Sequence, residues 1–112
     1  MASGAQLSVT DQRLSNRHPV ELPLIAEHRR MGDVMLHVIN VSTTGFMVRG
    51  ELSLERGERV TVRLQHIGRI EAFLVWSDGK RAGFQFERII RNDDFLLMIK
   101  ALQPNPRLHR PR

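Results

Sequence analysis

The sequence predicts a mainly β fold, namely a six-stranded antiparallel β-barrel with one C-terminal α-helix. Between residues 18 and 86, six short stretches have strand patterns, and several of them alternate apolar with other residues. Near the C-terminus the apolar period changes to that of a helix. One helix cannot cover six antiparallel strands. Because closure of the sheet also removes exposed edges, we expect a closed or nearly closed barrel with the helix against one end.

The first two predicted strands differ in character. In the first, Val20, Leu22 and Leu24 alternate with other residues, but two prolines at positions 19 and 23 confine it to an edge or an irregular stretch. The second, residues 34–41, is apolar on both faces apart from His37. We therefore expect it to be more central than the first.

Four further strands follow, separated by turns. Residues 46–49 form a short third strand, and 59–65 give the cleanest alternation in the chain. Residues 70–76 and 82–86 complete the set, joined by the sequence Ser-Asp-Gly-Lys (77–80), in which Asp-Gly favours the positive φ angles of a hairpin turn. Other turns are expected at residues 56–58 and 67–68.

The helix is indicated by one apolar stripe, and its ends are marked. The stripe has the spacing i, i+3, i+4, i+7 and consists of Phe95, Met98, Ile99 and Leu102. Asn92 can cap its start, and Pro104 ends it. We expect residues 1–12 to be a flexible leader, residues 13–103 the barrel domain, and residues 104–112 a disordered basic tail with three prolines and three arginines.

Composition excludes several classes of function. The chain of 112 residues has no cysteine, which excludes disulfides, zinc fingers and thiol nucleophiles. No apolar run approaches the roughly 20 residues of a membrane span, and the first residues lack the pattern of a signal peptide, so we expect a cytoplasmic protein.

The net charge is +5, and only Lys80 and Lys100 among 17 basic residues are lysine. Arginine reads phosphates and guanine edges with a planar fork, although a GC-rich genome would also favour it.

Two short segments stand out as candidate binding elements. Arg13 and Arg17 lie four residues apart just before the first strand, where they form a basic arm. Asn40, Ser42 and Gly45 lie at the junction of the second and third strands. Asn and Ser side chains can bond nearby backbone groups and fix a turn, and we expect Gly45 to supply a left-handed backbone conformation.

Together, Arg-x-x-x-Arg and Asn-x-Ser-x-x-Gly resemble the paired signature of PilZ domains, the bacterial receptors for cyclic di-GMP. The stretch His-Pro-Val-Glu-Leu-Pro (18–23) is similar to the first strand of that family. Trp76, Gly-Phe-Gln-Phe (83–86) and the C-terminal helix are similar to its late elements, so the resemblance covers about residues 13–102. The second motif often starts with Asp in the family. Asn40 keeps the hydrogen bonds without the charge, which implies that binding survives, with lower affinity.

The resemblance implies a non-enzymatic receptor that binds cyclic di-GMP through Arg13, Arg17, Asn40, Ser42 and Gly45. Arginine forks match both the O6 and N7 acceptors of guanine and the phosphates. The arm would fold over the barrel and create a surface for an unidentified effector protein, in motility, polysaccharide or developmental machinery. No cofactor or metal is expected, because no histidine pair has metal-ligand spacing.

Two alternatives stay open at this point. The first is a PilZ-like interaction module that has lost ligand binding, although the motifs here are complete. The second is a small nucleic-acid-binding barrel, which the positive charge and basic tail favour. We expect neither nucleic acid as the partner nor catalysis, since no constellation of acid, base or nucleophile is present; Ser42 is not in a nucleophile elbow with His37 and Asp33.

Overall fold

The computed structural model describes residues 17–102 and confirms the predicted fold class. The strands are β1 (His18–His28), β2 (Gly32–Val41), β3 (Gly45–Arg49), β4 (Arg59–Leu64), β5 (Gly68–Ser77) and β6 (Arg81–Phe86), and the helix is α2 (Asn92–Leu102). The leader at 1–12, the arm residue Arg13 and the tail at 104–112 lie outside the described residues.

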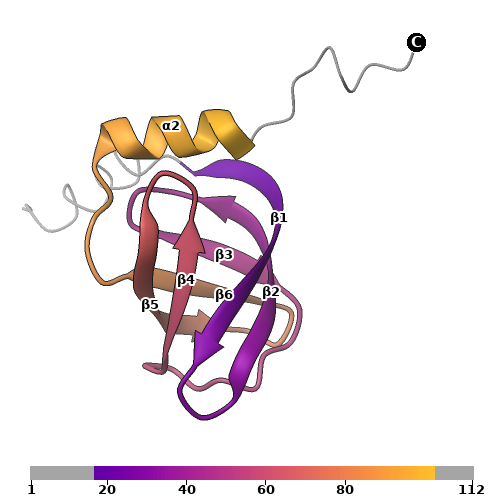
Figure 1. Cartoon of the computed structure of the whole chain (residues 1–112). Helices are drawn as coiled ribbons and strands as arrows, with labels where there is room; N and C mark the ends of the chain where they lie inside the picture. The colour runs from indigo at the N-terminus through magenta and orange to yellow at the C-terminus, as the bar shows by residue number, and fades with distance from the viewer. Residues whose placement is uncertain (1–16, 103–112) are drawn as a thin grey trace, which may run out of the picture.

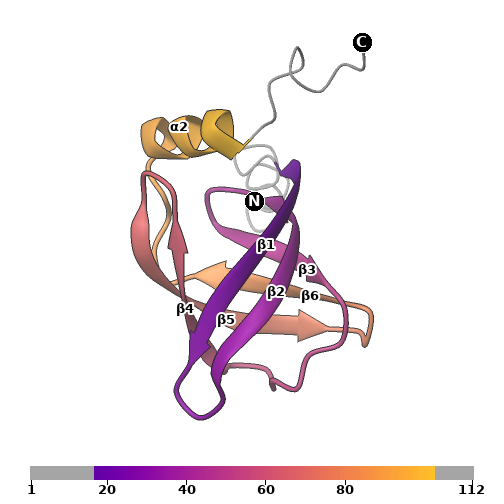
Figure 2. The same cartoon turned by 45° about the vertical axis from the view of Figure 1, so that its right-hand side comes forward.

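The six strands form one closed antiparallel barrel. Their order around the barrel is β1-β2-β3-β6-β5-β4, so β3 pairs with β6 across a long stretch of intervening chain. Figures 1 and 2 show α2 lying across the end of the barrel where β1 begins, above the turn between β4 and β5. Among residues 17–102, no helix has both the length and the apolar character that a membrane crossing requires.

The helix is held by the stripe that the sequence predicted. Phe95, Met98 and Ile99 are buried against the barrel core, and Leu102 is partly buried. The ring of Phe95 also packs against the ring of His18 at the start of β1, with centroids 5.2 Å apart. The acidic residues Asp93 and Asp94 occupy the first turn, where the helix dipole favours negative charge. The stripe therefore covers the end of the barrel at which the candidate binding elements meet.

One seam of the barrel is much weaker than the others. β1 and β4 pair only through Glu27 and Thr61, whereas every other pair of neighbouring strands has at least four paired positions. Pro19 and Pro23 lack the backbone N–H that a ladder needs, and β1 also has a register shift after Pro19. The expected irregularity of the first strand is therefore seen in its pairing with β2, where the register shift lies.

The second strand is not buried on both faces as its composition suggests. Its inward residues Leu36 and Val38 are buried, but Met35 and His37 are exposed on the outer wall. A closed barrel has one interior, so each strand buries only alternate residues whatever its outer face carries. The apolar outer face of β2 is therefore exposed, although the strand pairs with both β1 and β3.

At the end of the barrel opposite α2, a buried histidine ties two turns together. His28 Nδ1 accepts hydrogen bonds from the backbone N–H groups of Arg30 and Met31, at 3.1 and 3.0 Å. Its Nε2 therefore carries the proton and donates to Glu58 Oε1 at 2.6 Å. Hydrogen bonds from the Glu55 N–H, Arg30 and His28 lower the pKa of Glu58 from 4.5 to about 2.

Candidate functional site

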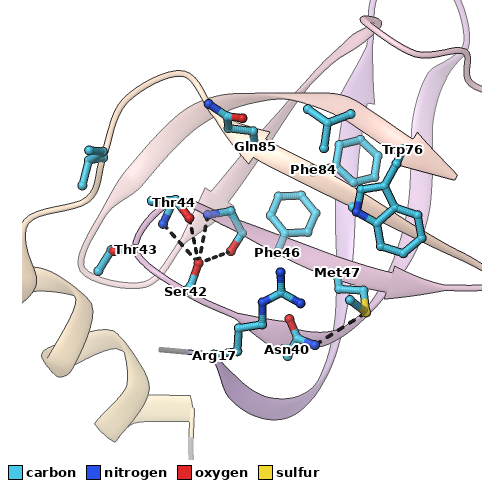
Figure 3. Close-up of a pocket in the computed structure, with 14 residues that line it drawn as sticks. Arg17, Asn40, Ser42, Thr43, Thr44, Phe46, Met47, Trp76, Phe84 and Gln85 are labelled. Atoms are coloured by element: carbon cyan, nitrogen blue, oxygen red, sulfur yellow. Dashed lines mark hydrogen bonds between the residues drawn. The ribbon is translucent and has the colours of Figure 1, made fainter. Parts of the chain in front are cut away.

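A pocket of about 530 Å³ lies where the start of β1, the end of β2 and the outer side of β3, β5 and β6 meet. Four of the five predicted site residues line it: Arg17, Asn40, Ser42 and Gly45. The fifth, Arg13, lies outside the described residues. Figure 3 shows the Arg17 side chain reaching over the pocket beside Asn40. The fold thus brings together residues that are far apart in the sequence.

The turn between β2 and β3 is organised by Ser42. Its backbone N–H donates to Gly45 O at 2.8 Å. Its hydroxyl oxygen accepts from the N–H groups of Thr44 and Gly45, at 3.2 and 3.3 Å, and lies 3.1 Å from the Thr44 hydroxyl (Figure 3). Ser42 is 5% exposed, so its hydroxyl is committed to the turn. These bonds fix the turn in the way expected of a serine at this position.

The same turn is anchored to β6 and to the segment that leads into α2. The carbonyl of Thr44 accepts from the N–H of Phe86 at 2.8 Å. The carbonyl of Thr43 accepts from the N–H of Ile90 at 2.9 Å, and Ile90 is buried. Any displacement of this turn must therefore disturb either the end of β6 or the residues before α2.

Gly45 is required for a different reason from the one that the sequence suggested. Its backbone does not take a positive φ, so the expectation of a left-handed conformation was wrong. A Cβ at this position would lie 2.0 Å from the carbonyl oxygen of Phe84 on β6. Only glycine allows β3 to approach β6 this closely.

Asn40 keeps polar atoms available at the pocket. It is partly buried and faces Met47 across the β2–β3 ladder, next to a register shift. Its side-chain nitrogen donates to Met47 Sδ at 3.6 Å, a weak acceptor. Among the described residues this is the one hydrogen bond of its side chain, so the amide oxygen can accept from a bound molecule.

The pocket also has an aromatic wall, which the sequence motifs did not indicate. Trp76 is only partly buried and lines the pocket. It faces Gly83 across the β5–β6 ladder, and a Cβ on Gly83 would lie 2.2 Å from the indole nitrogen. A tryptophan and a glycine at facing positions of one hairpin are the signal that could have revealed this wall; the register shift between Leu74 and Trp76 obscures it.

Among residues 17–102, the residues considered for catalysis or metal binding do not converge at this pocket. The hydroxyl of Ser42 bonds within its own turn, and His37 and Asp33 are exposed on the outer face of β2. Within the described part of the chain, no three His, Asp or Glu residues gather as a metal would need. The described arrangement offers hydrogen-bonding groups, a guanidinium and an aromatic face, which suit binding of a polar planar molecule.

The comparisons with known proteins agree with this geometry. No match was found among curated proteins. The solved structure of the Bacillus subtilis inhibitor of motility (MotI/DgrA) is similar to this chain, with a TM-score of 0.53 and 20% identity, over 86% of this chain and 51% of that chain. This chain therefore spans about half the length of that protein, and the likeness shows the fold. The model of the PilZ domain matches residues 11–101. The chain belongs to the PilZ domain family.

Proposed function

We propose that this chain is a non-enzymatic receptor for cyclic di-GMP. The observation that carries the proposal is the convergence of Arg17, Asn40 and the Ser42–Gly45 turn on one pocket. Its volume, about 530 Å³, lies within the roughly 300–1,000 Å³ usual for small-molecule sites. The family match supports the class of ligand.

Each pocket residue has a chemical part in this proposal. The Arg17 guanidinium pairs with guanine O6 and N7 or with a phosphate, both of which accept a fork of two donors. The amide of Asn40 bonds a base edge, and the indole of Trp76 offers a face on which a guanine can stack. Ser42 and Gly45 hold the turn in the shape that leaves room for the nucleotide.

The output of the receptor is proposed to be a protein contact. Arg13 would join Arg17 on the nucleotide as the arm folds over the barrel, and the rearranged surface would act on an effector protein. Motility, polysaccharide and developmental machinery are the candidate settings. The name of the structural neighbour, an inhibitor of motility, favours the first.

Calorimetric titration with cyclic di-GMP tests the proposal, and the single tryptophan gives a second signal because it lines the pocket. We expect Arg13→Ala and Arg17→Ala each to weaken binding by about 1.5–3 kcal/mol, the loss of charge-assisted hydrogen bonds. The matched control is Arg29→Ala, an exposed arginine in the turn at the opposite end of β1. Wild-type affinity in both arm variants would rule out this site, and absence of binding by the wild type would favour an interaction module.

A further inference from the structure

A second groove lies outside the proposed nucleotide pocket, in the weak seam between β1 and β4. It has a volume of about 360 Å³, and both strands contribute to it, through Pro23, Ile25 and Glu27 on one side and Val62 and Arg63 on the other. Figures 1 and 2 show that β1 and β4 meet at the end of the barrel away from α2 and diverge from each other toward α2. Among residues 17–102, the two strands do not pair beyond the Glu27–Thr61 bridge, so we infer that backbone groups there can pair with another strand.

The rim of this groove carries two arginines that break a rule of sheet pairing. Arg63 on β4 and Arg69 on β5 are directly opposite each other in the ladder, and both are exposed. Like charges at such positions repel and destabilise a sheet. Among residues 17–102, Arg63 has no ion pair. Within the same range, the ion pair of Arg69 is a loose one, with 3.4 Å between Arg69 Nη2 and Glu27 Oε1. Two positive charges therefore face one negative charge across the groove.

Apolar residues flank the arginines. The Ile25 side chain is 54% exposed and lines the groove. It is opposite Met35, which is 57% exposed, on the outer wall of β1 and β2. An arginine pair beside exposed aliphatic side chains has the composition of a protein interface. Glu27 and the small excess of positive charge argue against nucleic acid, which requires several phosphate contacts.

We propose that the β1–β4 groove binds an extended acidic segment of a partner protein. The segment adds as a strand along the unpaired seam, with its carboxylates on Arg63 and Arg69 and its apolar side chains against Pro23 and Ile25. An extended segment rather than a helix is inferred because the groove runs between two strands that pair only at Glu27 and Thr61. The inference rests on the proposed function in one respect: the groove would be the place where the receptor contacts its effector protein.

The test uses fluorescence anisotropy with a fluorescein-labelled nonapeptide of alternating valine and glutamate, and the same peptide with lysine in place of glutamate. We expect the wild type to bind the glutamate peptide, Arg63→Glu to weaken it by about tenfold or more, and Arg63→Glu with Arg69→Glu to prefer the lysine peptide. Arg56→Glu, in the turn before β4 and outside the groove, is the control and should bind like the wild type. If the reversed charge of Arg63→Glu impairs folding, Arg63→Gln replaces it, with a smaller expected loss of affinity for the glutamate peptide.

Three results would overturn the inference. They are equal binding of both peptides by the wild type, an unchanged affinity in Arg63→Gln and Arg63→Glu, or tighter, Arg63-dependent binding of a single-stranded DNA oligomer. Backbone amide chemical shifts separate this inference from the nucleotide proposal. The peptide should shift residues 61–64, and cyclic di-GMP should shift residues 42–45. The experiment can therefore show that one ligand does not bind while the other does, so the two proposals can be rejected separately.

Discussion

At the scale of single residues, the hydroxyl of Ser42 accepts hydrogen bonds from two N–H groups of its own turn, those of Thr44 and Gly45. Arg17 is exposed, and the Asn40 amide makes one weak hydrogen bond among the described residues. In the proposed site, Arg17 and Asn40 are therefore the groups that would contact a nucleotide. In the same proposal, Ser42 would act on the ligand through the shape of the turn.

We expect Ser42→Ala to lower the free energy of unfolding by about 1–3 kcal/mol, because the buried Gly45 N–H loses its acceptor along with that of Thr44. Urea unfolding measures this loss, and Ser77→Ala, at an exposed serine on β5, is the control. Any loss of cyclic di-GMP affinity should follow the loss of turn stability. A variant as stable as the wild type that binds much more weakly would instead assign the hydroxyl a direct contact.

The lowered pKa of Glu58 predicts how the stability of the protein responds to acid. Its pKa in the folded protein is lowered to about 2 from 4.5, so the carboxylate form is favoured by folding. The resulting stabilisation is present above pH 4.5 and is lost as the pH falls toward 2. We expect the urea midpoint to fall across this window and Glu58→Gln to flatten that fall. An identical acid profile in the variant would show that other carboxylates cause the transition.

At the scale of elements, the β3–β6 pair depends on the absence of one side chain. A Cβ at Gly45 would lie against the Phe84 carbonyl, and carbonyls of the neighbouring turn hold Phe86 and Ile90. Strand pairing and the candidate site therefore share a single position. A change that separates the two strands must also move the turn that carries Ser42.

Gly45→Ala and Gly57→Ala distinguish close approach from backbone strain. Gly57 has a φ of +91° with open space around it, so alanine there should cost about 1–2 kcal/mol through strain alone. Alanine at Gly45 meets backbone at 2.0 Å, and we expect a larger loss of stability together with weaker cyclic di-GMP binding. Thermal melts and titrations of both variants check this. Equal losses at the two positions would contradict the close-approach explanation.

Most elements were predictable from the apolar period and the turn residues, but what each element packs against was not. Alternation in β4 and the stripe of α2 follow directly from which residues must be buried. The exposure of Met35 and His37 could not be read from β2, because its outer face is as apolar as an inner one. The place of Trp76 at the pocket could not be predicted either, because the register shift between Leu74 and Trp76 leaves no local signal in the sequence. The pairing of β3 with β6, which puts the turn beside the late strands, is likewise non-local.

At the scale of the whole molecule, the barrel joins two kinds of contact. Four of its six seams connect strands that follow one another in the sequence, and the β3–β6 and β1–β4 seams connect distant ones. The proposed nucleotide pocket is built around β3 and β6, where pairing is extensive. The proposed peptide groove lies in the β1–β4 seam, where it is minimal. The same topology therefore gives the proposed nucleotide pocket extensively paired strands and the proposed peptide groove a weakly paired seam.

The single Glu27–Thr61 bridge has a kinetic consequence. Closing the β1–β4 seam orders a long loop in return for few hydrogen bonds, so we expect it to form after the folding transition state. The chain has no native cysteine, and directly paired Cα atoms are close enough for a disulfide, so Glu27→Cys with Thr61→Cys can lock this seam. Relative to the reduced variant, the oxidised one should gain about 3–4 kcal/mol, nearly all of it as slower unfolding. Stopped-flow experiments over a range of urea concentrations measure the folding and unfolding rates. If the cross-link instead accelerated folding, the β1–β4 seam would already be formed in the folding transition state.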